Sequence, residues 1–286
     1  MKAASADAYR HYEQAVIVSG GQMTEASVAR IVGHLREALR CNPQLGEAHA
    51  MLGRAFEFMA ARKLGWPWLR RWQAARHFRC ALTRLSPAEV DWSEARLGLA
   101  ASLARRGKYA ATREVVAPLL QRGHQDARRR GLVLVGVAAF HSGRTDEALG
   151  HWRAAQKLCR SDAIAIEVTH PNVWLRRGHL QEAARTMKRR HFTTAIQHLE
   201  AVVALGGPFV QPSDFVKLHD AFKAAGQHDQ ARDAYTEAVA LHRELVGDED
   251  TPIDYTQMRV ESSGSGVYAY DQHIDGLAAD SDARTK

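Results

Sequence analysis

The sequence predicts an all-α fold in which antiparallel helix pairs repeat along the chain. Glycines recur at four matching places: Gly107, Gly143, Gly178 and Gly226. A small residue stands five positions after each of them: Thr112, Ala148, Ala183 and Ala231. The first three glycines are separated by 36 and then 35 residues, and a fixed period of about 34 residues is typical of helix-turn-helix solenoids. A repeat array of this kind indicates that the protein binds a partner rather than catalyses a reaction.

The composition agrees with a helical array and narrows the class of protein. Of 286 residues, 45% are apolar, and long windows are rich in Ala, Leu, Arg and Glu, which are good helix formers. The N-terminus lacks the apolar core of a secretory signal, and no apolar run approaches the length of a membrane span. The three cysteines lie far apart without zinc spacing, as expected of free thiols in a reducing compartment. We therefore expect a cytoplasmic protein with no membrane span.

The N-terminal half divides into helices bounded by turn residues. We expect a first helix over residues 4–18, a second from Ser27 to Pro43, and a third over 46–62. The next helix spans 69–85 and is closed by Ser86 and Pro87, since proline is common just past a helix end. A weaker copy of the repeat follows at Gly107, Tyr109, Thr112 and Val116.

The clearest copies of the repeat lie further along the chain. One comprises Leu132, Val135, Gly136, Gly143, Ala148, Trp152 and Ala155. The other comprises Phe215, Leu218, Phe222, Gly226, Ala231, Tyr235 and Ala238. Small residues let paired helices approach closely, and large ones fill the space between them. In these positions the chain resembles the tetratricopeptide repeat (TPR) family over about residues 4–246, as about six repeats. The resemblance implies a right-handed superhelix in which the first helix of each pair (helix A) lines a concave, peptide-binding face.

Two departures from the family pattern stand out. The spacing from Gly53 to Ala74 is 21 residues, longer than in the family, and the extra residues at 63–68 form a loop or a bent helix extension. Gly178 and Gly226 are 48 residues apart, about 14 more than one repeat. Residues 179–205 keep helical spacing without Pro or Gly, which favours one long helix. The alternative starts a helix A at Pro171 and its partner at His191.

The sequence contains no motif for catalysis or for a cofactor. It has no GxxxxGK[ST] loop, GxSxG elbow, HExxH pair or CxxC pair. The 15 histidines are scattered. His191 and His198, two helical turns apart, are expected on a helix surface rather than at a metal. We therefore predict a protein that is not an enzyme and holds no cofactor or metal.

The TPR resemblance supplies candidate binding residues on the A helices. The main candidates are Arg54, Arg105, Arg130, His141, Asn172, Arg176, Lys217 and Lys223. The further groove candidates on these helices are Glu57, Leu97, Val137 and Asp220. This set would give a mildly cationic groove, suited to a protein or peptide partner with acidic groups. The alternative is a solvated surface of mixed charge.

Outside the repeats, the sharpest local feature is Trp66-Pro67-Trp68, with Trp72 close by. Trp is enriched at interaction hot spots, so Trp66 and Trp68 are a second candidate contact. The alternative is that these rings pack back over the first repeats. A membrane-surface role is disfavoured because no long amphipathic basic helix is expected around the loop.

Charge is distributed unevenly along the chain. The net charge is +7, but residues 247–286 hold nine acidic and three basic residues, so residues 1–246 carry +13. The acidic tail, with Tyr255, Tyr268 and Tyr270, is either a solubility segment or a competitor tethered beside the groove. Basic clusters lie in the body, but no nucleic-acid motif accompanies them, so nucleic acid is not the expected partner.

The sequence as a whole predicts a TPR array over residues 1–246 followed by the tail at 247–286. Its expected function is a non-catalytic adaptor or scaffold that binds a protein or peptide through the concave face. Two alternatives stay open: an accessory subunit or chaperone of a biosynthetic or secretion complex, and a nucleic-acid-binding regulatory solenoid.

Overall fold

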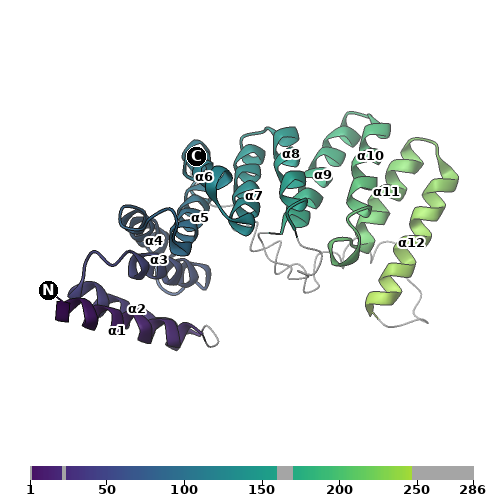
Figure 1. Cartoon of the computed structure of the whole chain (residues 1–286). Helices are drawn as coiled ribbons and strands as arrows, with labels where there is room; N and C mark the ends of the chain where they lie inside the picture. The colour runs from purple at the N-terminus through teal and green to yellow at the C-terminus, as the bar shows by residue number, and fades with distance from the viewer. Residues whose placement is uncertain (1, 21–23, 160–169, 247–286) are drawn as a thin grey trace. The chain divides into compact units, whose positions relative to one another are not determined.

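The computed structural model of the protein describes residues 2–20, 24–159 and 170–246. These residues form α-helices and one short 3-10 helix, and no strand occurs among them (Figure 1). The helices are α1 (Lys2–Ser19), α2 (Glu25–Cys41), α3 (Gly46–Ala61), α4 (Pro67–Leu82), α5 (Val90–Arg105), α6 (Tyr109–Arg122), α7 (Gln125–His141), α8 (Thr145–Gln156), α9 (Pro171–Lys188), α10 (Phe192–Val203), η1 (Gly207–Phe209), α11 (Pro212–Ala224) and α12 (His228–Val246). The predicted all-α class is confirmed.

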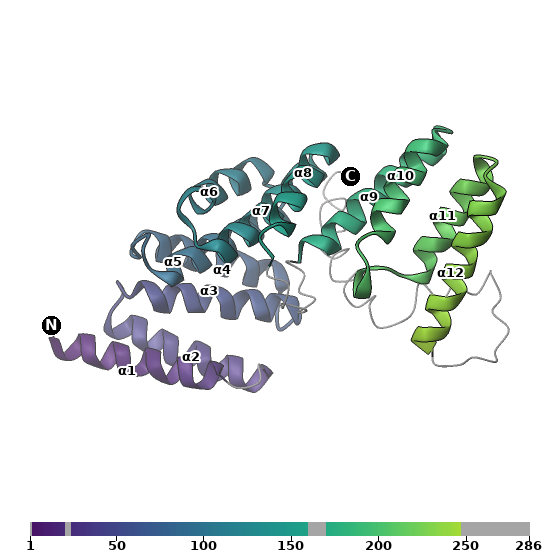
Figure 2. The ribbon, with the colours of Figure 1, turned by 45° about the vertical axis from the view of Figure 1, so that its right-hand side comes forward.

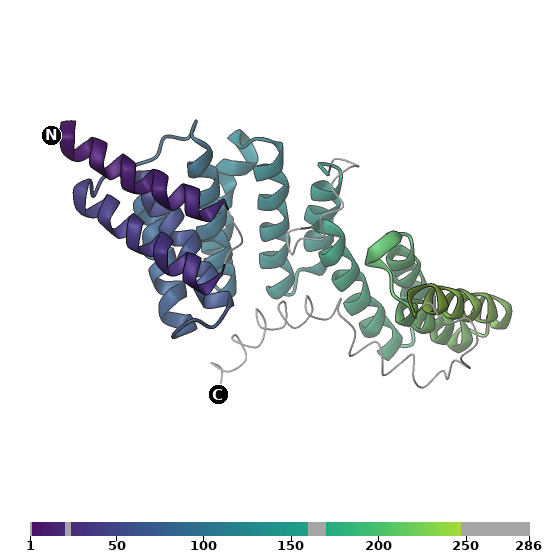
Figure 3. The same cartoon turned by 90° about the horizontal axis from the view of Figure 1, so that it is seen from below.

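Consecutive helices pack as antiparallel pairs. The closest packed neighbours include α1 with α2, α3 with α4, α9 with α10 and α11 with α12. Figure 2 shows the α11–α12 pair side by side, and Figure 3 shows the same for α1 and α2. The chain divides into two compact units, residues 1–138 and 139–286, with the boundary inside α7. The predicted tail at 247–286 lies outside the described residues.

After the first pair, every described turn between the two helices of a pair uses one hydrogen-bond pattern. All of these turns except the α9–α10 turn lie where the sequence predicts them. After α7, the N–H of Gly143 donates to the carbonyl of Phe140 (2.9 Å) and the N–H of Arg144 donates to that of Ala139 (3.0 Å). This is a Schellman motif, which satisfies carbonyls left open at a helix end. It requires one residue with positive φ, and five residues take this place: Lys63, Gly107, Gly143, Arg190 and Gly226.

The expectation for the third glycine was wrong. Gly178 lies inside α9, and the turn after α9 occurs at Arg190, with φ of 60°. The N–H of Arg190 donates to Met187 (3.0 Å), and the N–H of His191 donates to Thr186 (2.9 Å). The single helix over 179–205 is therefore wrong, and the alternative pair beginning at Pro171 and His191 is correct.

The small residue of this repeat is also displaced. Ala195 stands five positions after Arg190 and is fully buried in α10, where the pattern had suggested Ala183. Measured between turn residues, the spacing is 36 from Gly107 to Gly143, 47 from there to Arg190, and 36 to Gly226. The extra residues therefore precede α9 instead of following Gly178.

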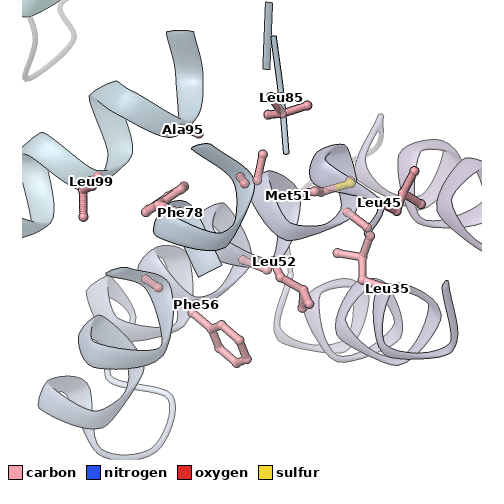
Figure 4. Close-up of a cluster of buried hydrophobic side chains, with 14 of the residues drawn as sticks. Leu35, Leu45, Met51, Leu52, Phe56, Phe78, Leu85, Ala95 and Leu99 are labelled. Atoms are coloured by element: carbon pink, nitrogen blue, oxygen red, sulfur yellow. The ribbon is translucent and has the colours of Figure 1, made fainter. Parts of the chain in front are cut away.

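The core of the first unit is organised around one phenylalanine of α4. Phe78 is 1% exposed and belongs to a cluster of buried side chains that includes residues of α2 to α5 (Figure 4). A Cβ atom added at Gly53 of α3 would lie 2.4 Å from the Phe78 ring, and one at Gly98 of α5 would lie 2.3 Å from it. Both glycines are needed because any side chain there would overlap the ring.

The second unit repeats this arrangement with a tryptophan. Trp152 of α8 is fully buried and stacks on Trp174 of α9, with ring centroids 5.7 Å apart. A Cβ atom at Gly178 would lie 2.9 Å from both Trp152 and Leu149. Gly178 therefore allows α9 to approach α8, which explains why a glycine stands there without forming a turn.

Candidate functional site

Polar side chains of the first unit link each A helix to the next. Arg105 of α5 forms a hydrogen-bonded ion pair with Glu57 of α3. Arg130 of α7 lies 2.6 Å from Glu94 of α5. Three of the predicted candidates, Arg54, Arg105 and Arg130, thus lie on successive A helices, as the repeat positions implied, and each faces a carboxylate. We call the surface formed by Arg54, Glu57, Asp91, Glu94, Arg105 and Arg130 the A-helix surface.

These ion pairs are only partly accessible to solvent. The side chains of Arg130 and Glu94 are 26% and 20% exposed, so their attraction is screened less than that of a surface pair. The third pair is looser. Arg54 is 48% exposed and lies 3.7 Å from Asp91. Burial raises the pKa of Asp91, and the nearby Arg54 partly offsets this rise.

In the second unit the pairing is tighter. Arg176 of α9 donates two hydrogen bonds to the carboxylate of Asp214 in α11, at 2.8 and 2.9 Å, and a third to Gln211 at 2.8 Å. The side chain of Asp214 is fully buried and also accepts from the backbone N–H of Gln211 (3.0 Å). Arg176 is therefore a structural anchor between α9 and α11. Lys217 lies at 3.4 Å from the same carboxylate and is half exposed.

The remaining candidates differ in their surroundings. Asn172 is 9% exposed, and its Oδ1 accepts a hydrogen bond from Gln156 of α8 (2.9 Å). His141 lies at the end of α7, and burial, followed by the charge of Arg177, lowers its pKa. Lys223 is exposed, and Asp220 is partly exposed.

Two apolar positions are not surface residues. Leu97 and Val137 are 3% and 7% exposed, so they belong to the core between helices. Their predicted place in a groove was wrong. The prediction used only their positions in the family repeat, and in this chain the neighbouring helices cover both side chains.

The acidic partners of the arginines were missed or undervalued at the sequence level. Glu94, Asp91 and Asp214 were not among the candidates. The sequence does contain a signal for two of them, since Arg130 and Glu94 are separated by 36 residues and Arg176 and Asp214 by 38. An acid and a base one repeat apart are brought to neighbouring A helices at the same height. The charge of the A-helix surface is consequently balanced locally.

Histidines form two further polar pairs, each between an A helix and its B helix. The Nδ1 atoms of His49 and His77 are 3.0 Å apart, and those of His179 and His198 are 2.9 Å apart. His198, which was expected on a helix surface, therefore pairs with His179 of α9. Within the described residues, no group of three or more His, Cys, Asp or Glu side chains is placed to hold a metal ion.

The tryptophans of the 63–68 segment do not pack back over the repeats. Trp66 and Trp68 are 69% and 57% exposed. Their rings contact each other edge to face, with centroids 6.0 Å apart. Residues 62–66 form a tight loop between α3 and α4, Trp66 stands just before α4, and Trp68 lies in its first turn.

Solved structures similar to this chain are TPR proteins. PilF of Pseudomonas aeruginosa aligns over 91% of this chain and 99% of its own, with 15% sequence identity and a TM-score of 0.54. YrrB, a TPR protein with an unusual peptide-binding site, covers 72% of this chain and 91% of its own, at 12% identity and a TM-score of 0.44. MamA covers 71% of this chain and 98% of its own, at 13% identity and a TM-score of 0.44.

The likeness to PilF establishes the fold and nothing about the partner. The sequence matches no protein-family model and no curated protein. With its helix pairs and Schellman turns, the chain has the TPR-type helical-repeat fold that its sequence predicts. Among the described helices, none is both long and apolar enough to cross a membrane.

Proposed function

Given a TPR-type fold, we propose that the protein is a non-catalytic adaptor that binds an extended protein or peptide segment on its A-helix surface. The observation that carries the proposal is the series of partly buried Arg–carboxylate pairs on α3, α5 and α7. Because these side chains bind one another, they form a polar platform rather than a set of reacting groups.

The spacing of the platform suits an extended chain. Packed helices lie about 8–10 Å apart, and an extended chain rises about 3.3 Å per residue. About every third residue of a bound segment would therefore reach the next A helix. A guanidinium has five N–H donors, and Arg130 contacts Glu94 through Nη1, so other donors can bind carbonyl or carboxylate oxygens of the segment.

The proposal places the partner among proteins or peptides with acidic groups. Arg54 is an exposed cation on this surface, and it would attract such a segment. The described cysteines are free thiols, which fits the cytoplasmic location that forms part of the proposal.

The test begins with a random peptide library panned on the immobilised full-length protein. Selected peptides are then measured by fluorescence anisotropy against four proteins: the wild type, R130E, the charge swap E94R/R130E, and R128E. Arg128 is exposed on the same helix but two positions from Arg130, and so on a different face. We expect R130E and the swap each to weaken binding about tenfold or more, and R128E to leave it within about twofold.

The charge swap separates recognition from folding. It keeps an ion pair between α5 and α7 but exchanges the positions of the two charges. If the swap restores wild-type affinity, Arg130 acts only by holding the helices together and the proposal for this surface is wrong. Selection of no peptide by the library would also contradict it.

A further inference from the structure

The outer side of α4 carries three exposed tryptophans followed by arginines. Trp68, Trp72, Arg76 and Arg79 are all exposed, and their spacing of four, four and three residues places them on one helix face. Trp66 precedes them. Trp72 is 49% exposed, and the guanidinium of Arg76 lies 5.9 Å from its ring centre. We call the set Trp66, Trp68, Trp72, Arg76 and Arg79 the Trp–Arg surface.

The segment around this surface has only one sign of charge. Residues 58–88 contain seven Lys and Arg residues and no Asp or Glu. The nearest acid on the N-terminal side, Glu57, is paired with Arg105. On the opposite face of α4, Ala74, Ala75, Phe78 and Ala81 are buried. The 16-residue helix α4 therefore has an apolar face in the core and an aromatic, cationic face outside. This differs from the sequence-based expectation that no long amphipathic basic helix lies around the loop.

The position of the tryptophans is fixed by the loop that precedes them. Leu64 donates its N–H to Met59 (2.8 Å), which closes α3 with Lys63 at φ of 57°. Arg70 points back and donates to the carbonyl of Leu64 (3.3 Å) and to Gln73 (3.0 Å). Pro67 begins α4 at its first turn, where its ring is favourable. The turn that carries the indole rings is therefore held in place by backbone and side-chain hydrogen bonds.

We propose that the Trp–Arg surface docks on a membrane leaflet rich in anionic phospholipid. Tryptophan concentrates at the level of lipid headgroups because its ring is apolar while its N–H is polar. Arginine binds phosphate oxygens with two parallel hydrogen bonds. A helix lying flat on the leaflet would insert the three rings at its N-terminal end and set its arginines against phosphates.

The uniform charge favours a lipid surface over a folded protein partner. The charged pairs elsewhere in the molecule show both signs side by side, as on the A-helix surface. Between residues 58 and 88 no carboxylate is present to guide the register of a partner. A leaflet of anionic headgroups requires no register, because it presents phosphate at every position.

Intrinsic fluorescence provides a direct test, because the six tryptophans fall into two groups. Trp92, Trp152 and Trp174 are at most 5% exposed, while the three of the Trp–Arg surface are about half exposed or more. The full-length protein is mixed with vesicles of phosphatidylcholine alone or of equal parts phosphatidylcholine and phosphatidylglycerol. Emission and co-sedimentation are recorded. With the anionic vesicles we expect binding and a blue shift of the emission. We expect binding to the neutral vesicles to be weaker by about tenfold or more.

Variants assign the effect to the surface. W68S/W72S should lose most of the blue shift, and R76E/R79E should weaken vesicle binding about tenfold or more. The matched control is R122E/R128E, which makes the same change in net charge at two exposed arginines of α6 and α7 and should bind within about twofold of wild type. R130E, which tests the A-helix surface, should also bind vesicles normally.

Three results would overturn the proposal. The first is absence of binding to anionic vesicles. The second is an equal loss in R122E/R128E, which would indicate attraction by net charge alone. The third is a blue shift with a polyglutamate peptide and none with vesicles, which would assign the surface to an acidic protein segment.

Discussion

The hydrogen bond between His49 and His77 requires at least one of the two rings to be neutral, because the accepting nitrogen must be unprotonated. The Nε2 atom of His49 lies 3.2 Å from the carbonyl of Pro43, which can only accept, so Nε2 carries the proton. The Nδ1 atom of a neutral His49 then accepts from the Nδ1–H of His77. Burial, and next the proximity of His49, lower the pKa of His77 to about 4. Burial, and next the proximity of His198, lower the pKa of His179 to about 4 as well.

The stability of the fold should therefore fall in mild acid. A histidine with a lowered pKa contributes its full stability above the unfolded value of about 6.5 and loses it as the pH drops toward the folded value. Between pH 6.5 and about 4, we expect the free energy of unfolding to decrease by at most about 1.4 kcal/mol per pH unit for each such histidine. Urea unfolding at several pH values measures this slope.

The histidine prediction has a matched pair of variants. H77Q keeps a polar side chain that cannot be charged, so its slope should be shallower than that of the wild type. His228 is exposed, and H228Q should leave the slope unchanged. An unchanged slope in H77Q would show that another group causes the acid sensitivity.

Residue roles could be predicted from the sequence only where packing alone determines them. Ala148, Trp152 and Ala231 were placed in the core by spacing, and they are buried. The partners of Arg130 and Arg176 were not found, because a carboxylate on a helix reads equally well as a solvated residue. The separation of each carboxylate from its arginine by about one repeat is the signal that distinguishes the two cases.

At the level of helices and turns, the glycines of the repeat serve two different purposes. Gly143 has φ of 76°, and no atom lies within 4 Å of an added Cβ, so its role is conformational. Gly178 has ordinary helical φ but lacks room for a side chain. We expect G143A to cost about 1 kcal/mol, since left-handed strain is partly offset by the lower entropy of the unfolded chain. We expect G178A to cost about 1–3 kcal/mol through overpacking.

Second substitutions distinguish the two mechanisms. Asn tolerates the left-handed region better than Ala, so G143N should be more stable than G143A. At Gly178 the larger Asn should be worse than Ala, and shortening the neighbour in G178A/L149A should recover little, because it opens a cavity elsewhere. Urea unfolding measures the free energy of unfolding of each variant. If Asn and Ala rank in the same order of stability at both sites, the two glycines do not serve different purposes.

The same contrast explains which helices could be predicted. Two helices followed by a proline, α2 and α4, were placed within a few residues of their observed ends. The boundary between α9 and α10 was not, because Arg190 adopts the left-handed conformation that glycine adopts at lower cost. Nothing in local composition marks that turn. It is stabilised by its two backbone hydrogen bonds, and Ala195 of the following helix is fully buried.

For the molecule as a whole, charge separation between body and tail predicts a kinetic effect. Removing residues 247–286 raises the net charge from +7 to +13. At low ionic strength we expect the truncated protein to associate faster than the full chain with a polyglutamate peptide, because long-range attraction steers encounter. In about 1 M salt, where screening reaches about 3 Å, the two rates should converge. Stopped-flow fluorescence measures both; equal rates at low salt would contradict the prediction.

The fold class and the repeat could be predicted from the sequence because they depend on a pattern averaged over many residues. The division into two compact units at residue 138 could not, since no linker or change of composition marks it within α7. The exposure of Trp66 and Trp68 also could not, because a ring that packs inward and one that faces solvent have the same sequence.

The position of Phe78 has a mechanical consequence. Its ring fills the space left by Gly53 on one side and Gly98 on the other, so one side chain sets the angle at which α5 joins the α3–α4 pair. Each later helix of this unit packs on the one before it. A small rotation between α5 and the α3–α4 pair would therefore displace the later helices by a larger distance. A substitution of Phe78 would then alter the pitch of the array at helices that the ring never touches.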